Sequence, residues 1–88
     1  MKLKYTFESV DMGDEIISVP VGEGALKVQG VLKLNAEGRE ILDMLKADTT
    51  EKQIVDALEA KYENDRAMLV RYVGDALRSL RDAGLIEE

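Results

Sequence analysis

With 88 residues, a formal net charge of −6 and neither histidine nor cysteine, the chain is expected to form one small domain over residues 1–88. The missing side chains exclude thiol nucleophiles, disulfides and nitrogen- or sulfur-ligated metals, together with the commonest general base. The acidic balance disfavours binding to phosphate backbones or anionic membranes and favours a basic partner, although solubility alone explains it equally well.

The first part of the chain is predicted to form strands. Apolar and polar residues alternate over residues 2–8, which is the period of a half-buried strand. Asp11–Asp14 predicts a turn in which Gly13 can adopt a positive φ. In the strand that follows, Ser18 and Pro20 share one face and β-branched residues share the other. Because proline lacks an N–H, it fits an edge or a strand end best.

The segment over residues 25–34 leaves two interpretations open. Residues 25–28 and 31–34 can form two short strands around a tight turn at Gln29-Gly30. Alternatively, the whole segment is one longer strand with a bulge at Gly30. The β-rich part, residues 1–34, is therefore expected to contain a small antiparallel sheet of three strands, with four as the alternative.

At Asn35 the spacing of apolar residues changes from two to three and four, which indicates a strand that leads directly into a helix. Asn35 is a good N-cap, and Glu37 places a negative charge beside the positive end of the helix dipole. The helix is predicted over about residues 36–46. Gly38 lies inside its apolar arc, where glycine costs about 0.5–1 kcal/mol relative to alanine. We therefore expect a close approach between this helix and the element on which it packs.

Two more helices are predicted after the first. A capping box that begins at Thr50 predicts a second helix over about residues 51–62. Asp65 is a good N-cap for a third helix, over about residues 66–83, and Gly84 suits the left-handed position that ends it.

The third helix has an unusually wide apolar surface. Its apolar residues spread over about 200°, whereas a helix that packs on one side needs little more than half of that. Either the helix is central and contacts both the sheet and the other helices, or one flank is kept for a partner, and the two interpretations are compatible. Its arginines alternate with Asp75 and Asp82 on the polar arc, which is more typical of a solvated charged face than of a DNA-binding surface.

No motif supports an enzyme. The acidic residues are scattered and form no calcium-binding loop, Gly22 and Gly24 precede no phosphate-binding helix, and the serines lack a base that would activate them. The sequence contains no apolar run long enough to span a membrane and no signal peptide, which favours the cytoplasm.

The run Val31–Leu42, the second helix that begins after Thr50, and the closing Gly84–Ile86 resemble the PqqD family, and the resemblance extends over about residues 5–86. The matching positions are Leu34, Asn35, Gly38, Ile41, Leu42, Ile54, Val55, Leu58, Leu77, Leu80, Gly84, Leu85 and Ile86. The resemblance implies an α+β, winged-helix-like fold, in which a three-stranded antiparallel sheet precedes three helices. A winged helix also makes a DNA-binding regulator the alternative function.

The resemblance further implies a non-catalytic protein without a cofactor. Such a protein binds the leader segment of a ribosomally made precursor peptide and presents it to a modifying enzyme. That enzyme is often a radical S-adenosylmethionine protein, as in the biosynthesis of pyrroloquinoline quinone or of related peptide products. The expected partners are the leader peptide and this enzyme, without nucleic acid or membrane, and the expected state is a monomer or a weak homodimer.

In the family, the peptide adds as a strand to the sheet edge and packs against the third helix. Transferred to this sequence, the edge comprises Val31, Leu32, Lys33 and Leu34, and the helix flank comprises Val70, Gly74, Leu77 and Arg81. The opposite flank, with Met68, Tyr72 and Ser79, is the fallback. The first flank is preferred because a glycine in mid-helix is explained if another backbone comes close.

Overall fold

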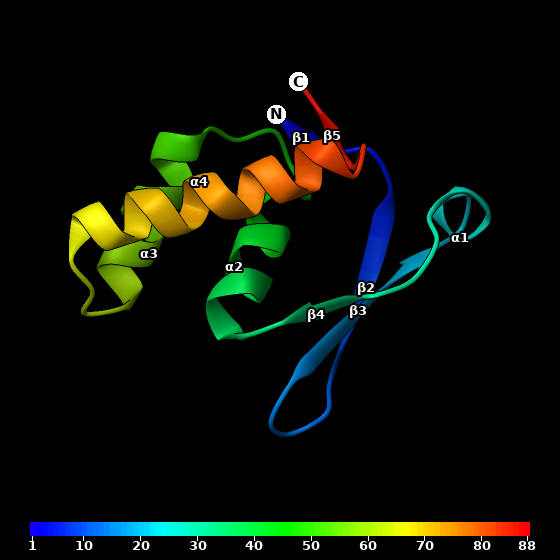
Figure 1. Cartoon of the computed structure of the whole chain (residues 1–88), viewed down its shortest axis with the longest axis horizontal. Coiled ribbons are helices and arrows are strands. Elements are labelled where there is room, and N and C mark those ends of the chain that lie inside the picture. Colours follow the sequence, from blue (N-terminus) through cyan, green and yellow to red (C-terminus); the bar gives the residue numbers. More distant parts are fainter.

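The computed structural model describes all 88 residues. The elements in chain order are β1 (Lys2–Leu3), β2 (Thr6–Asp11), β3 (Ile16–Val21), α1 (Gly24–Lys27), β4 (Leu32–Leu34), α2 (Ala36–Met44), α3 (Glu51–Lys61), α4 (Arg66–Asp82) and β5 (Ile86–Glu87). Figure 1 shows α2, α3 and α4 gathered on one side of the molecule and the main sheet with α1 on the other. The predicted α+β architecture, with a three-stranded antiparallel sheet and three helices after Asn35, is confirmed.

The main sheet has the strand order β2-β3-β4, and both pairs are antiparallel. Directly opposed residues share a face of the sheet, so the pairs Phe7↔Pro20 and Ser18↔Leu32 define its inner face. Phe7 and Ser18 are both buried there. β4 reaches only as far as Ser18, so Pro20 has a neighbouring strand on one side alone, as expected of a proline near a strand end.

Both interpretations of the segment over residues 25–34 are wrong for residues 25–27. These residues belong to α1, a single helical turn, and only Leu32–Leu34 forms a strand. The turn is closed by the Val28 N–H, which donates to the Gly24 carbonyl at 2.8 Å. The ion pair between Lys27 Nζ and Glu23 Oε1, also 2.8 Å, spans one turn of helix and supports it further.

The three longer helices begin where the capping residues predicted. Asn35 Oδ1 accepts a hydrogen bond from the Gly38 N–H, which caps α2. The capping box of α3 is complete, with reciprocal hydrogen bonds between Thr50 and Gln53. Asp65 caps α4 through its side chain. These contacts join residues two or three positions apart, which explains why they are visible in the sequence.

The helix α4 lies across the core and supplies four of its buried side chains, Leu69, Val73, Leu77 and Leu80. The remaining members of the core are Phe7, Ile41, Leu42, Leu45, Ile54, Val55, Leu58, Leu85 and Ile86. The helix is therefore central, as one interpretation proposed. It also keeps exposed apolar side chains, with Met68 at 68% and Val70 at 46% exposure, and a flank kept for a partner stays a prediction.

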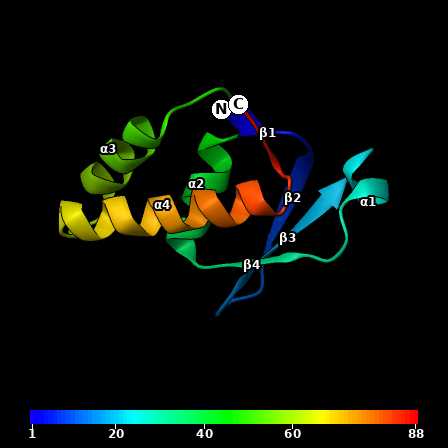
Figure 2. The ribbon, with the colours of Figure 1, turned by 45° about the horizontal axis from the view of Figure 1, so that its top comes forward.

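A second sheet joins the two ends of the chain. The sequence predicts one strand over residues 2–8, but the chain leaves the extended pairing between Leu3 and Thr6. The short β1 instead pairs antiparallel with β5, with Leu3 opposite Ile86. Figure 2 shows the two termini side by side at this point. None of the helices combines the length and the hydropathy that a membrane span requires.

Candidate functional site

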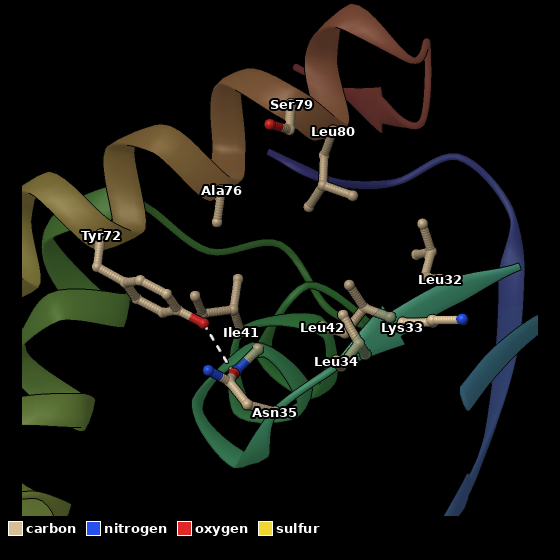
Figure 3. A pocket seen from close by; sticks show the side chains of 11 residues that line it. Leu32, Lys33, Leu34, Asn35, Ile41, Leu42, Tyr72, Ala76, Ser79 and Leu80 are labelled. Carbon is tan, nitrogen blue, oxygen red and sulfur yellow. Dashed lines mark hydrogen bonds between the residues drawn. The ribbon is translucent and has the colours of Figure 1, made fainter. Parts of the chain in front are cut away.

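A cavity of about 310 Å³ lies between β4, α2 and α4, and it is called the groove below (Figure 3). Its lining is mostly apolar and comprises Leu32, Lys33, Leu34, Asn35, Gly38, Ile41, Leu42, Tyr72, Ala76, Ser79 and Leu80. The contribution of α4 comes from positions spaced by three or four residues, which lie on one face of a helix. In Figure 3 the side chains of Leu32 and Leu34 point toward this face of α4.

The groove exists because two of the α4 side chains that line it are short. Ala76 and Ser79 stand at the middle of the α4 wall, and they leave open the space above Ile41 and Leu42. Both α2 residues are buried and form an apolar floor. An apolar side chain placed in this space would be removed from water on several sides, which is the main source of favourable binding free energy for such a group.

Gly38 allows the floor of the groove to approach β4. A Cβ atom at this position would lie 3.1 Å from Asn35 Oδ1 and 3.4 Å from Leu34 Cβ. The first turn of α2 is therefore packed directly against the end of β4, which is the close approach that the glycine predicted.

One end of the groove is closed by a hydrogen bond between two of its walls. The Tyr72 hydroxyl donates to Asn35 Oδ1 at 2.8 Å (Figure 3). Partial burial raises the pKa of Tyr72, and the nearby carboxylate of Glu37 acts in the same direction. The phenol is therefore neutral at physiological pH and can act as the donor.

β4 is an edge strand. It pairs with β3 on one side and with no strand on the other. Such an edge carries free N–H and C=O groups that can pair with an added strand. Because successive side chains of a strand point to opposite faces, Leu32 and Leu34 face the groove, while Lys33 shares the outer face with its partner Ile17. A free edge thus lies directly beside an apolar cavity.

The structure brings part of the predicted site together at the groove. Leu32, Lys33 and Leu34 are among its lining residues, while Val31 precedes the strand and is exposed. The fallback flank also reaches this region: Tyr72 and Ser79 line the groove, and Met68 lines a smaller cavity next to it.

The preferred flank of α4 lies elsewhere, and none of its four residues lines the groove. Leu77 is fully buried in the core, and Arg81 forms an ion pair with Glu88. Val70 is exposed, and a Cβ atom at Gly74 would have only Glu51 Oε1, at 4.0 Å, within reach. Six residues that line the groove lie outside the site predicted from the sequence, namely Asn35, Gly38, Ile41, Leu42, Ala76 and Leu80. Tyr72, Ala76 and Ser79 are spaced by three or four residues, and this spacing is the feature of the sequence that indicates a shared helix face.

The family model of PqqD, described as coenzyme PQQ synthesis protein D, matches residues 23–86. A solved structure described as TbiB1 in complex with the TbiA(beta) leader peptide is similar to this chain, with a TM-score of 0.71 and 30% sequence identity. The match covers 99% of this chain and 95% of that chain. A comparison with curated proteins gives no match.

Proposed function

The chain belongs to the PqqD family, and from this membership we propose that it is a non-catalytic domain that binds the leader segment of a ribosomally made precursor peptide. The observation that carries the proposal is the position of the free edge of β4 directly beside the apolar groove. The similar chain in complex with a leader peptide, aligned over nearly the whole length of this one, supports it.

In this proposal, the leader peptide adds as a strand to the free edge of β4. Main-chain hydrogen bonds hold an added strand, and alternate side chains enter pockets that provide selectivity. Each such hydrogen bond contributes only about 0.5–1.5 kcal/mol net. A micromolar complex requires about 8 kcal/mol. The side chains that enter the groove must supply much of the difference, at about 1.5–3 kcal/mol for each large apolar group.

The bound peptide would then be presented to a modifying enzyme. The resemblance to the family makes a radical S-adenosylmethionine enzyme the expected partner, and the domain itself contributes binding rather than chemistry. The alternative function, a DNA-binding regulator, gains no support from the comparisons. The descriptions that match concern coenzyme synthesis and a leader peptide.

An NMR titration tests the proposal directly, with the leader segment of the precursor peptide encoded beside the gene. We expect the amide signals of β4 and those of residues 72–80 in α4 to shift together, because the peptide would lie between these elements. Shifts confined to α3, or no shifts with that leader at concentrations well above micromolar, would contradict it. Duplex DNA at low salt serves as the control ligand, since phosphate contacts are strongest there.

A further inference from the structure

A second cavity, of about 200 Å³, lies directly beyond the closed end of the groove. It is lined by Asn35, Glu37, Asn64, Met68, Leu69 and Tyr72. Asn35 and Tyr72 also line the groove, so their hydrogen bond forms the partition between the two spaces. A strand that lies in the groove and continues past this partition would reach the second cavity with its next inward-facing side chains.

Glu37 is the only charged residue of the second cavity, and its carboxylate has no cationic partner. It takes part in none of the ion pairs of the structure. The neighbouring acidic side chains Glu40 and Asp43, on the same helix, are both paired with lysine or arginine. Glu37 also benefits from the dipole of α2, but that interaction occupies neither carboxylate oxygen.

The remaining walls suit the rest of a basic side chain. Met68 and the ring of Tyr72 provide apolar surface. The methylene stem of lysine or arginine can pack along this surface while its charged end stays in polar surroundings. An aromatic ring also attracts a cation placed over its face. Asn35 Oδ1 already accepts two hydrogen bonds, whereas the side chain of Asn64 makes none within the protein and can accept one from the ligand.

We propose that the second cavity is a subsite for a basic side chain of the bound peptide, with Glu37 as the residue that selects it. The inference rests on the proposed function, because it assigns a preference to the same peptide strand. Side chains on one face of a strand recur about every 7 Å. The basic residue is therefore expected two or four positions from the apolar residue in the groove. The net charge of −6 favours the approach of such a peptide.

The test is a selection from a displayed library of random dodecapeptides against wild-type protein, Glu37→Gln, Glu37→Lys and the control Glu8→Lys. Glu8 lies on β2, at the opposite edge of the sheet from β4, and the control changes the net charge by the same amount as Glu37→Lys. Wild type and Glu8→Lys should enrich a lysine or arginine at a constant distance from an apolar residue. Glu37→Lys should enrich an acidic residue at that position, and Glu37→Gln should show no charge preference.

Enriched peptides should lose about tenfold or more in affinity when their basic residue is replaced by norleucine, the effect of one charge-assisted hydrogen bond. In Glu37→Gln, the replacement by norleucine should change the affinity very little. The NMR spectrum of the backbone amides of this variant serves as the control that it is folded. The same enriched profile for wild type and Glu37→Lys would overturn the subsite while leaving peptide binding intact. If no variant enriches any peptide, the proposed function itself fails, and the subsite fails with it.

Discussion

Tyr72 and Asn35, which are 37 positions apart in the chain, are joined by a hydrogen bond of 2.8 Å from the phenol to Asn35 Oδ1. The same oxygen accepts the N–H of Gly38 at 2.8 Å and thereby caps α2. One amide oxygen therefore links α4 to the corner between β4 and α2, and it holds together the two walls of the groove at its closed end.

The variant Tyr72→Phe removes this link and leaves the cap of α2 intact. Because the ring keeps its packing and Tyr72 is 37% exposed, we expect a loss of about 0.5–1.5 kcal/mol in the free energy of unfolding. Denaturant unfolding of the two proteins measures it. Asn35→Ala removes both hydrogen bonds and should cost more than Tyr72→Phe, because the loss of the helix cap is added. Equal losses in the two variants would contradict this account.

Tyr72 should also make stability depend on pH in the alkaline range. Burial, and then the charge of Glu37, raise the pKa of this phenol above its ordinary value of 10.0. The unfolded chain then releases the phenol proton at lower pH than the folded chain does. The stabilisation is complete below the unfolded pKa and is lost as the pH rises through the folded pKa.

We therefore expect the stability of wild type relative to Tyr72→Phe to be constant up to about pH 9. Above about pH 10, wild type should lose stability relative to this variant. Denaturant unfolding at a series of pH values measures this difference, and the comparison cancels the titration of the lysines. A constant difference throughout the alkaline range would show that Tyr72 does not titrate differently in the folded state.

Filling the groove should weaken peptide binding without unfolding the protein. In Ala76→Leu, the longer side chain would occupy the space above Ile41 and Leu42 that the peptide needs. We expect at least about a tenfold loss of leader-peptide affinity, which corresponds to one buried apolar side chain, with the melting temperature unchanged or raised. Isothermal titration calorimetry measures the affinity. The control Ala67→Leu makes the same change at an exposed position of α4 that does not line the groove, and it should bind normally.

Two glycines should respond in opposite ways to alanine. At Gly74 a Cβ atom would meet only Glu51 Oε1, at an unstrained 4.0 Å, so Gly74→Ala should stabilise α4 by about 0.5–1 kcal/mol. At Gly38 the added Cβ would lie 3.1 Å from Asn35 Oδ1. This oxygen is held by two hydrogen bonds and cannot move without weakening them, so Gly38→Ala should destabilise the protein. Thermal unfolding of both variants measures the two effects.

The Gly74→Ala variant also distinguishes the two flanks of α4. If the peptide lies in the groove, Gly74→Ala should bind it with unchanged affinity. A loss of affinity in this stabilised variant would instead favour the flank of Val70, Gly74, Leu77 and Arg81, where a peptide backbone would need to approach the glycine.

The sequence by itself determined the start of each long helix and the change from strand to helix at Asn35. Those features depend on contacts between residues two to four positions apart, such as the bonds of the capping box at Thr50. Such contacts leave a local pattern of residue types. The strand beside the groove was also accessible, because its alternating apolar residues directly precede the cap of α2, whereas its place at the sheet edge was expected only from the family resemblance.

The helical turn α1 depended on tertiary packing. A Cβ atom at Gly24 would lie 2.9 Å from Tyr5 Cβ, so the turn is held against a segment from the start of the chain. Its four residues are too few to show helical periodicity. The pairing of β1 with β5 likewise joins residues such as Leu3 and Ile86, and two-residue strands carry no recognisable alternation.

Which flank of α4 faces the sheet edge was decided by the tertiary structure alone. The wide apolar arc of this helix allows several rotations about its axis, and the sequence supported two of them. Burial of Leu69, Val73, Leu77 and Leu80 selects one rotation, which turns Tyr72, Ala76 and Ser79 toward β4 and removes Leu77 from the surface. The physical reason is that the free energy of burying those four side chains depends on all the elements packed around them, and no local pattern records that sum.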